Sequence, residues 1–303
     1  MKDRKHNRII TTKLPAVTVL ICLLAAVYLF VVRPAQLHWG ATAGEAARPM
    51  PGDDLVPAPT FCATRAITIR GTPKEVWPWL VQMGYRRAGY YGYDLIENLG
   101  SETGIRSADS ILPELQHPRT GDVLPISTAA SAFFGPMQQD SYLIWQGKTT
   151  APSDGSFVWA LYPIDNGHTR LISRVRLHYH WTEPRLLLLD IFTEFGDHVA
   201  VPKILLGIQA RVERRSLQSL GSEAIEIAVW VLALFEFAAA LVLLFCWPRW
   251  GSAWALGLAT GLSLLFVLYA RVPVWIGAAL SACILAGMFL ISSLSPLRGG
   301  EEE

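Results

Sequence analysis

Apolar residues are concentrated in a few long stretches of this chain, and polar residues fill its middle. The stretches 14–32, 224–247, 254–270 and 272–293 are almost free of charged side chains. The hydrocarbon core of a bilayer takes a helix of roughly 20 apolar residues, a length that the third stretch only just reaches. Tryptophan and tyrosine lie near several of the ends, where amphipathic rings favour the membrane interface. The pattern therefore predicts four transmembrane helices, the first of them an N-terminal anchor.

A cleaved signal peptide is the alternative interpretation of the first stretch. Residues 1–13 form a basic tail, and Ala41-Thr42-Ala43 resembles a cleavage site. The apolar run is long for a signal peptide, however, and this site lies well downstream of it. These two features favour an anchor that stays on the protein.

The basic tail also bears on orientation, because cytoplasmic flanks of membrane helices are rich in lysine and arginine. It favours a cytoplasmic N-terminus, which places the polar middle of the chain outside the cytoplasm. Arg211, Arg214, Arg215 and Arg271 favour the opposite orientation. We expect a multi-pass protein of the cell membrane whose polar domain is extracytoplasmic, since large domains can cross despite such charges.

Two short segments flank the predicted spans. Residues 33–63 are rich in proline, alanine and glycine and contain few large apolar side chains. This composition predicts an extended, semi-rigid linker. Residues 294–303 form a short acidic tail after the last span.

The polar middle, residues 64–217, is long enough for one domain with its own core. Thr64–Arg70 alternates and contains β-branched residues, which predicts a strand. Thr72, with Glu75 three residues later, predicts a capped helix that ends at Gly84. A short helix is predicted at Asp94–Leu99.

Further strands and one long helix follow. Asn166-Gly167 predicts a tight hairpin turn. Leu186–Arg215 has a helical apolar face. The order of elements predicts an α+β domain with helices packed on one side of a curved antiparallel sheet. The strands are expected at Val123–Ile126, Ser141–Gln146, Ser156–Tyr162 and Arg170–Trp181.

Five runs between about Pro51 and Glu213 stand out, namely TRAITIRGTPKEVWPWLVQMGYRRAGYYGYDLIENL, PGDDLVP, GDVLPI, HTRLISRVR and LLGIQARVE. They resemble the membrane-anchored branch of the SRPBCC superfamily, which includes START domains, Bet v 1-like plant proteins and polyketide cyclases. The resemblance implies a helix-grip fold, in which a long C-terminal helix closes a curved antiparallel sheet over a deep apolar cavity. It also implies binding of a lipid or another hydrophobic molecule.

The tyrosine- and glycine-rich run 84–100 is the first candidate site. It lacks the G-x-G-x-x-G spacing, and a net charge of +1 makes no case for nucleic acid. Its tyrosines either line the cavity mouth or pack the seam between helix and sheet. Together with other aromatic and basic residues they form the predicted ligand site: Trp79, Tyr90, Tyr91, Tyr93, Trp145, Trp159, Arg174 and Arg176.

Charged residues offer alternatives. Asp94 and Glu97 are either an acid–base pair or a helix cap and surface charges. Arg174 and Arg176 either cover a solvated sheet face or anchor an anionic headgroup. Glu236 lies in the middle of the second span, where an ionisable group is costly.

Glu236 is either functional or hydrogen-bonded across the helix bundle, with Thr260 or Ser263 as the expected partner. Asp190, Glu194 and His198 share one face of the long helix. Their spacing is used by metal ligands, but no HExxH motif accompanies them. We therefore interpret them as a charged outer face. Of the four cysteines, only Cys62 lies outside the predicted spans, which excludes a disulfide framework.

The leading hypothesis is a multi-pass membrane protein whose helix-grip domain binds a hydrophobic or amphipathic molecule such as a lipid. The alternatives are an enzyme that uses the same cavity as a cyclase, dehydratase or hydrolase, and a module that binds another membrane protein. The sequence assigns no catalytic residue, metal or cofactor.

Overall fold

The computed structural model describes residues 2–148, 153–180, 182–246 and 250–293. Trp181 and Trp247, at the ends of a predicted strand and a predicted span, lie outside these ranges, as does the predicted acidic tail. The chain forms two compact units. One consists of Ala35–Glu223, and the other of Met1–Pro34 together with Ala224–Glu303.

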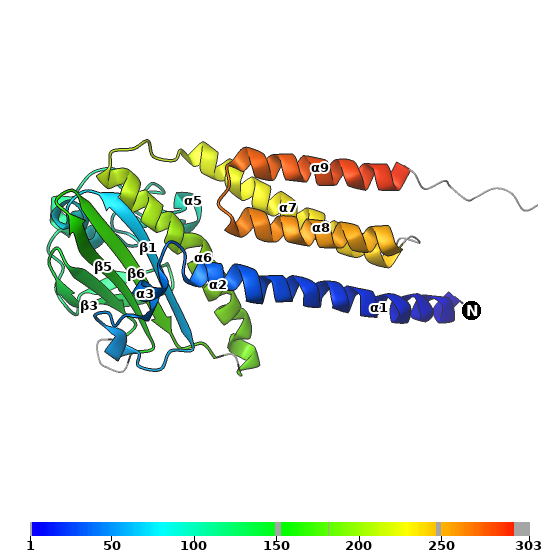
Figure 1. Cartoon of the computed structure of the whole chain (residues 1–303), viewed down its shortest axis with the longest axis horizontal. Helices are drawn as coiled ribbons and strands as arrows, with labels where there is room; N and C mark the ends of the chain where they lie inside the picture. The colour runs from blue at the N-terminus through cyan, green and yellow to red at the C-terminus, as the bar shows by residue number, and fades with distance from the viewer. Residues whose placement is uncertain (1, 149–152, 181, 247–249, 294–303) are drawn as a thin grey trace, which may run out of the picture. The chain divides into compact units, whose positions relative to one another are not determined.

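The second unit is helical (Figure 1). Among the described residues, three helices are long and apolar enough to cross a membrane, namely Lys13–Leu37, Leu220–Cys246 and Gly251–Tyr269. Val274–Leu290 is apolar but shorter, so the fourth span stays a prediction. The elements of this unit are α1 (Lys2–Val27), a π-helical turn η1 (Tyr28–Val32), α7 (Leu220–Cys246), α8 (Trp250–Tyr269) and α9 (Val274–Ser293). Helix α2 (Arg33–Leu37) follows η1 and lies mostly in the first unit.

The sheet of the first unit has six antiparallel strands in the order β1-β6-β5-β4-β3-β2. The Asn166-Gly167 turn joins β5 to β6 as predicted, with Asp165 paired to His168. The strands are β1 (Phe61–Arg70), β2 (Val123–Pro125), β3 (Ser131–Gln138), β4 (Tyr142–Gln146), β5 (Gly155–Asp165) and β6 (His168–Leu177).

Strand β3 was absent from the sequence prediction. Gly135 and Pro136 interrupt it, and both residues argue against a strand interior. The structure accommodates them with a register shift between Phe134 and Met137. A bulge of this kind lets a strand continue past residues that cannot fill the ladder.

The helices that follow β1 in this unit include α4 (Pro73–Gln82), α5 (Asp94–Glu97) and α6 (Pro184–Val212). The capping box between Thr72 and Glu75 is present, as predicted. The core lies between the sheet and the helices α4 and α6, where Leu80, Leu171 and Leu205 are fully buried. This is the helix-grip arrangement of a curved antiparallel sheet under a long C-terminal helix, and the predicted α+β class is confirmed.

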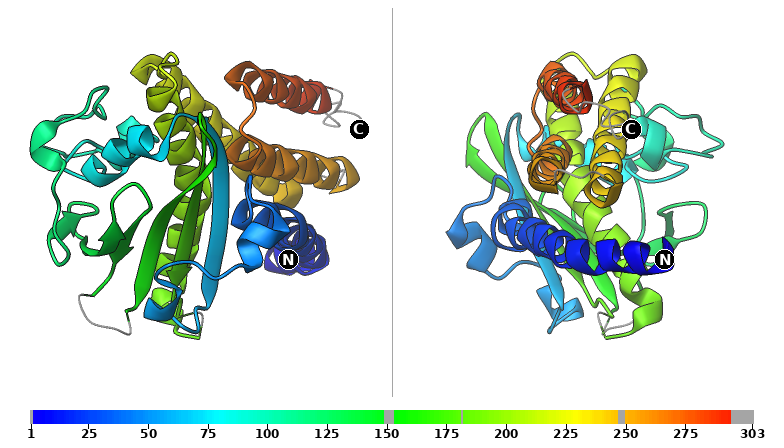
Figure 2. Two further views of the ribbon diagram at one scale, coloured as in Figure 1. Left: turned by 60° about the vertical axis from the view of Figure 1, so that its left-hand side comes forward. Right: turned by 90° about the vertical axis from the view of Figure 1, so that its right-hand side faces the viewer.

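The predicted extended linker has a different structure. Residues 33–63 contain α2, α3 (Ala43–Ala47) and the 3-10 turn η2 (Asp53–Leu55). Residues 41–55 pack on the outer face of the sheet, whereas Leu37 of α2 packs with Phe61 and Ala63 on the inner face. Both views in Figure 2 show α6 and the segment around α3 on opposite sides of β1. The prediction of an extended tether was therefore wrong.

Arginines of β6 hold this segment in place. Arg174 donates to the carbonyl oxygens of Glu45 at 3.0 Å and Ala46 at 2.9 Å, and to Asp53 Oδ2 at 2.7 Å. Arg170 binds Glu45 Oε1 at 2.7 Å. That hydrogen bond outweighs the opposing effect of burial and lowers the pKa of Glu45 to about 2. Composition could not reveal this docking, because the main acceptors are backbone carbonyls.

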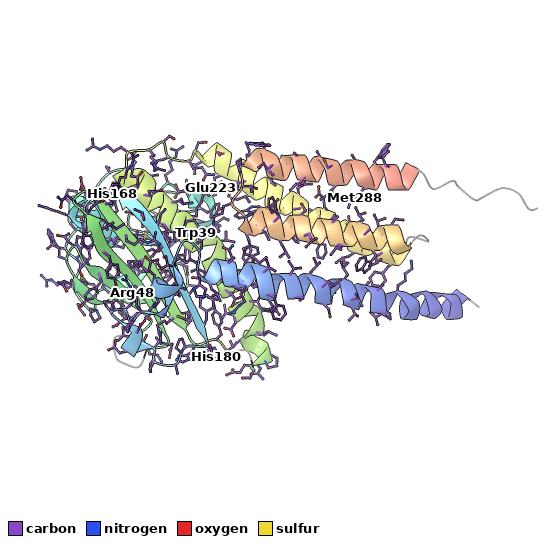
Figure 3. All side chains as sticks on the ribbon, viewed as in Figure 1. Trp39, Arg48, His168, His180, Glu223 and Met288 are labelled. Atoms are coloured by element: carbon purple, nitrogen blue, oxygen red, sulfur yellow. The ribbon has the colours of Figure 1, made fainter. Side chains whose placement is uncertain are left out.

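The same segment also carries Arg48, marked in Figure 3, whose guanidinium lies 3.7 Å from the ring centroid of Tyr162. Trp39, also marked, accepts a hydrogen bond from Ala66 N at 3.1 Å through its carbonyl oxygen. Strand β1 is an edge of the sheet. An unpaired edge is prone to aggregation, so this contact shields part of it.

Replacing Gly207 by alanine should destabilise the domain. A Cβ at Gly207 would overlap the carbonyl oxygen of Tyr91, where α6 passes closest to that loop. We expect a loss of about 1–3 kcal/mol, the usual cost of overpacking. Gly196→Ala is the matched control, because a Cβ there meets nothing within 4 Å. Thermal unfolding of the detergent-solubilised full chain measures both; equal midpoints for the two variants would contradict the close approach.

Replacing Arg174 by glutamine should also destabilise the fold. The change removes the hydrogen bonds that Arg174 donates to Asp53 Oδ2 and to three part-buried carbonyl oxygens. The expected loss is about 3 kcal/mol, as for removal of one partner of a buried ion pair. Limited proteolysis should then cut within residues 36–57 of the variant. Arg119→Gln, an exposed arginine, is the control, and an unchanged cleavage pattern in both variants would show that Arg174 does not hold the segment.

Candidate functional site

The inner face of the sheet, which looks toward α4 and α6, forms the candidate site. Trp145 on β4 and Trp159 on β5 lie there with ring centroids 5.6 Å apart. Trp79 of α4 meets Tyr91 edge to face at 5.9 Å, and Tyr90 meets Trp145 at 6.3 Å. All five belong to one buried cluster. The structure thus brings together five of the eight residues predicted as a ligand site; that they bind a ligand stays a prediction.

The tyrosine hydroxyls of this cluster are held by the backbone. Tyr90 Oη donates to Ile126 O at 2.8 Å, and Tyr91 Oη to Trp79 O at 3.2 Å. Burial raises the pKa of both phenols above the ordinary value, so both stay protonated. Tyr93 is also buried, with Lys203 Nζ 4.6 Å from its ring centroid. The tyrosines therefore position the loop after α4 as well as facing the core.

The two buried indoles differ from the tyrosines in their hydrogen bonding. Nε1 of Trp145 and Nε1 of Trp159 have no hydrogen-bond partner among the residues that the structure describes. A buried donor without an acceptor costs about 1–3 kcal/mol. Water or a ligand is the usual acceptor for such a group.

Arg174 and Arg176 do not face this core. They alternate with Ser173 and Val175 along β6 and project to the outer face. Arg176 Nε donates to Val56 O at 2.9 Å. Both side chains bind the segment before β1, and this explains why they are covered even though they lie on the polar face of the strand.

Arg65 is the inward-facing arginine, and the sequence analysis missed it. On α6, Asp197 Oδ2 lies 2.5 Å and His198 Nδ1 2.9 Å from its Nη2 atom. Its Nε donates to Gln36 O at 2.8 Å. The signal was present, since Arg65 falls on the same side of the alternating strand as Ala63, Ile67 and Ile69.

A polar stripe on α6 faces Arg65. Asp190, Glu194 and His198 are 5%, 4% and 0% exposed. The expectation of a charged outer helix face was therefore wrong. Asp190 Oδ2 accepts a hydrogen bond from His180 N at 2.6 Å, and His198 Nε2 lies 3.6 Å from Glu194 Oε1. Within the described part of the chain, no group of three or more His, Cys, Asp or Glu could hold a metal ion.

Arg65 and Asp197 form a buried ion pair. Burial alone would raise the pKa of Asp197, but the Arg65 guanidinium and the His198 ring outweigh it and hold that pKa below the ordinary value. Asp197 is therefore ionised at neutral pH. One of its oxygens, Oδ1, has no hydrogen-bond partner among the described residues.

Asp94 and Glu97 lie beside the loop that carries the tyrosines of this cluster, with the Ser107 hydroxyl between Asp94 and the N–H of Tyr91. Asp94 accepts hydrogen bonds from Ser107 Oγ at 2.5 Å and Ser107 N at 3.0 Å, so it fixes the loop that follows α5. Burial, together with Asp94 and Glu223, raises the pKa of Glu97 to about 8. Asp94 and Glu223, the latter marked in Figure 3, line a pocket of about 260 Å³ together with Lys203 and Tyr91.

Glu236 is buried in the helical unit. Ser281 Oγ of α9 donates to its Oε2 at 3.3 Å. The expected hydrogen bond across the bundle is thus present, but the partner is neither Thr260 nor Ser263. Thr260 Oγ1 binds Leu256 O at 2.9 Å within its own helix.

No protein-family profile and no curated protein matches the chain. Among solved structures, it is similar to protein MLL2253 from Mesorhizobium loti, with 16% identity and a TM-score of 0.31 over 52% of this chain and 100% of that one. It is also similar to the polyketide-cyclase-like protein Cgl2372 from Corynebacterium glutamicum, with 14% identity and a TM-score of 0.31 over 50% of this chain and 91% of that one. The Aha1 dimer from Colwellia psychrerythraea matches at 12% identity and a TM-score of 0.27 over 51% of this chain and 97% of that one.

These likenesses are too weak to carry an argument about function. The fold assignment rests instead on the strand order and on α6, which runs along β1 and contacts α4. That geometry is what the resemblance to the SRPBCC superfamily implies.

Replacing Glu97 by glutamine should stabilise the protein at alkaline pH. The pKa of Glu97 rises from an ordinary 4.5 to about 8 on folding. Between these values the unfolded state releases a proton that the folded state keeps, so wild-type stability falls as pH rises. At pH 8 the variant should be more stable by at least about 1 kcal/mol, the equivalent of roughly one pKa unit.

Thermal unfolding of the full chain at pH 5, 6.5 and 8 measures this effect. The exposed Glu114 provides the control variant Glu114→Gln, which should keep the wild-type pH dependence. A Glu97→Gln variant that loses stability between pH 5 and 8 as steeply as the wild type would contradict the raised pKa.

Proposed function

We propose that this protein is a multi-pass membrane protein whose helix-grip domain binds a hydrophobic or amphipathic small molecule between the inner face of the sheet and the helices α4 and α6. The observation that carries the proposal is the pair of buried indole N–H groups, on Trp145 and Trp159, that lack an acceptor among the described residues. They lie within a wall of aromatic side chains.

The aromatic rings of this wall suit the apolar part of an amphipathic molecule, and the unpaired indole N–H groups suit its polar part. Aromatic rings offer a large, rigid surface to an apolar body. Binding sites for small molecules are mostly apolar, with a small number of polar groups that fix orientation. The unpaired indoles supply such groups, and an acceptor on a ligand removes the cost of leaving them unpaired.

The apolar helices support a role at the membrane. The domain is continuous in sequence with α1 through α2 before it, and with α7 after it. A ligand that partitions into lipid reaches a high local concentration at the bilayer. Tethering a binding domain there raises its effective encounter rate with such a ligand.

Native mass spectrometry and solvent extraction of the purified full chain test the proposal. We expect a defined hydrophobic species at close to one molecule per chain. The double variant Trp145→Phe/Trp159→Phe keeps the rings but removes both N–H groups, and it should lower that occupancy severalfold. Recovery of folded wild-type protein without any defined species would overturn the proposal.

Lipid that adheres to the apolar helices is controlled with Trp254→Phe. Trp254 Nε1 donates to Ala16 O at 3.1 Å inside the helical unit. This variant should keep the wild-type occupancy of the defined species. If it lowers the occupancy as much as the double variant does, the species is bound to the helices and not to the domain.

A further inference from the structure

Three polar side chains form a row across the inner face of the sheet. Arg65 of β1 pairs in register with Ser173 of β6, and Ser173 pairs with Trp159 of β5. Residues directly opposite each other on neighbouring antiparallel strands project to the same face, with Cβ atoms about 5 Å apart. The Cβ atom of Ser173 therefore lies between those of Arg65 and Trp159.

Each member of this row has a polar atom without a partner. Arg65 Nη1, Ser173 Oγ and Trp159 Nε1 make no hydrogen bond to any described residue. The three side chains are 0%, 1% and 0% exposed. Three adjacent buried donors in a closed core are rare, because each unpaired group costs about 1–3 kcal/mol. The row therefore offers three polar atoms that no acceptor among the described residues meets.

The charges around the row decide what kind of acceptor fits. Arg65 is already matched by Asp197 at 2.5 Å. The other ionisable groups of the cluster are Glu194 and His198, which lie 3.6 Å apart. Even with the imidazole protonated, the cations of this cluster do not outnumber its carboxylates. A buried anion without excess positive charge is strongly disfavoured, whereas a neutral oxygen gains hydrogen bonds and meets no repulsion from Asp197.

We propose that the ligand of this domain presents a neutral acceptor oxygen, such as an ester or ketone carbonyl, to the row Arg65–Ser173–Trp159. The apolar part of the ligand then lies along the aromatic wall. A free fatty acid or a phosphate group is the wrong partner for this row. This inference rests on the function proposed above and names the chemical class of molecule that the same site takes.

Three probes with the same tail test the inference: methyl oleate, oleate and cis-9-octadecene. Each is added to the delipidated full chain in detergent at pH 8, where free oleate is ionised, and binding is measured by native mass spectrometry. The ester offers a neutral acceptor, oleate an anionic one, and the alkene none. We expect the ester to bind about tenfold more tightly than either other probe, equivalent to about 1.4 kcal/mol.

Two variants test whether the preference for the ester depends on Ser173. Ser173→Ala should reduce the preference for the ester over the alkene while leaving alkene binding unchanged, because one of the three donors is lost and those of Arg65 and Trp159 remain. Ser156→Ala is the matched control, because Ser156 is a buried serine of β5 whose hydroxyl also lacks a partner among the described residues, but it lies on the opposite face of the sheet. This control should keep the tenfold preference.

The other outcomes are distinct. If none of the probes binds, the proposed function itself fails. If all three probes bind equally, the proposed hydrophobic site is supported but the inference about the acceptor is overturned. The row then binds water and not the oxygen of the ligand. Tighter binding of oleate than of the ester would also overturn the inference, since the cluster would then accept an anion. A preference for the ester that is undiminished in Ser173→Ala would place the acceptor elsewhere.

Discussion

A buried guanidinium on the apolar side of the sheet is the constraint on which this domain depends. Arg65 has to be neutralised and hydrogen-bonded where it lies, because an unpaired charge in a protein interior is very unfavourable. Asp197 neutralises it from α6, and the carbonyl oxygen of Gln36 accepts from it before β1 begins. One side chain thereby connects the sheet, the long helix and the N-terminal segment. Such a pair contributes little net stability compared with apolar packing, but it penalises any arrangement in which the three elements do not meet.

The same constraint explains why the domain was only partly predictable from its sequence. Alternation, the capping box at Thr72 and the Asn166-Gly167 turn are local signals, and the structure follows them. The polar stripe on α6 was misassigned, because a charged face at helical spacing normally points to solvent. Its burial depends on Arg65, a residue more than a hundred positions away, and such a pairing is not visible in any local window of sequence.

The outer face of the sheet shows a second limit of local patterns. Arg170, Arg174 and Arg176 alternate as on a solvated strand, yet they are covered by the segment before β1. The acceptors they use are mainly backbone carbonyls, which every residue carries. Composition identified that segment as poor in large apolar residues, and this is correct. It could not show that the segment docks through polar contacts instead.

The strand order has a consequence for how the chain is made. Among the strands that the structure describes, β1 is an edge of the sheet next to β6, and β2 lies at the far edge. During synthesis, β1 and the segment before it therefore remain without their partners until His168–Leu177 has left the ribosome. Pairings between such distant parts of a chain form slowly, so the newly made N-terminal portion stays open for most of translation. A chaperone that binds exposed strands would bind this N-terminal portion, which is synthesised after the apolar helix α1 and before the arginines of β6.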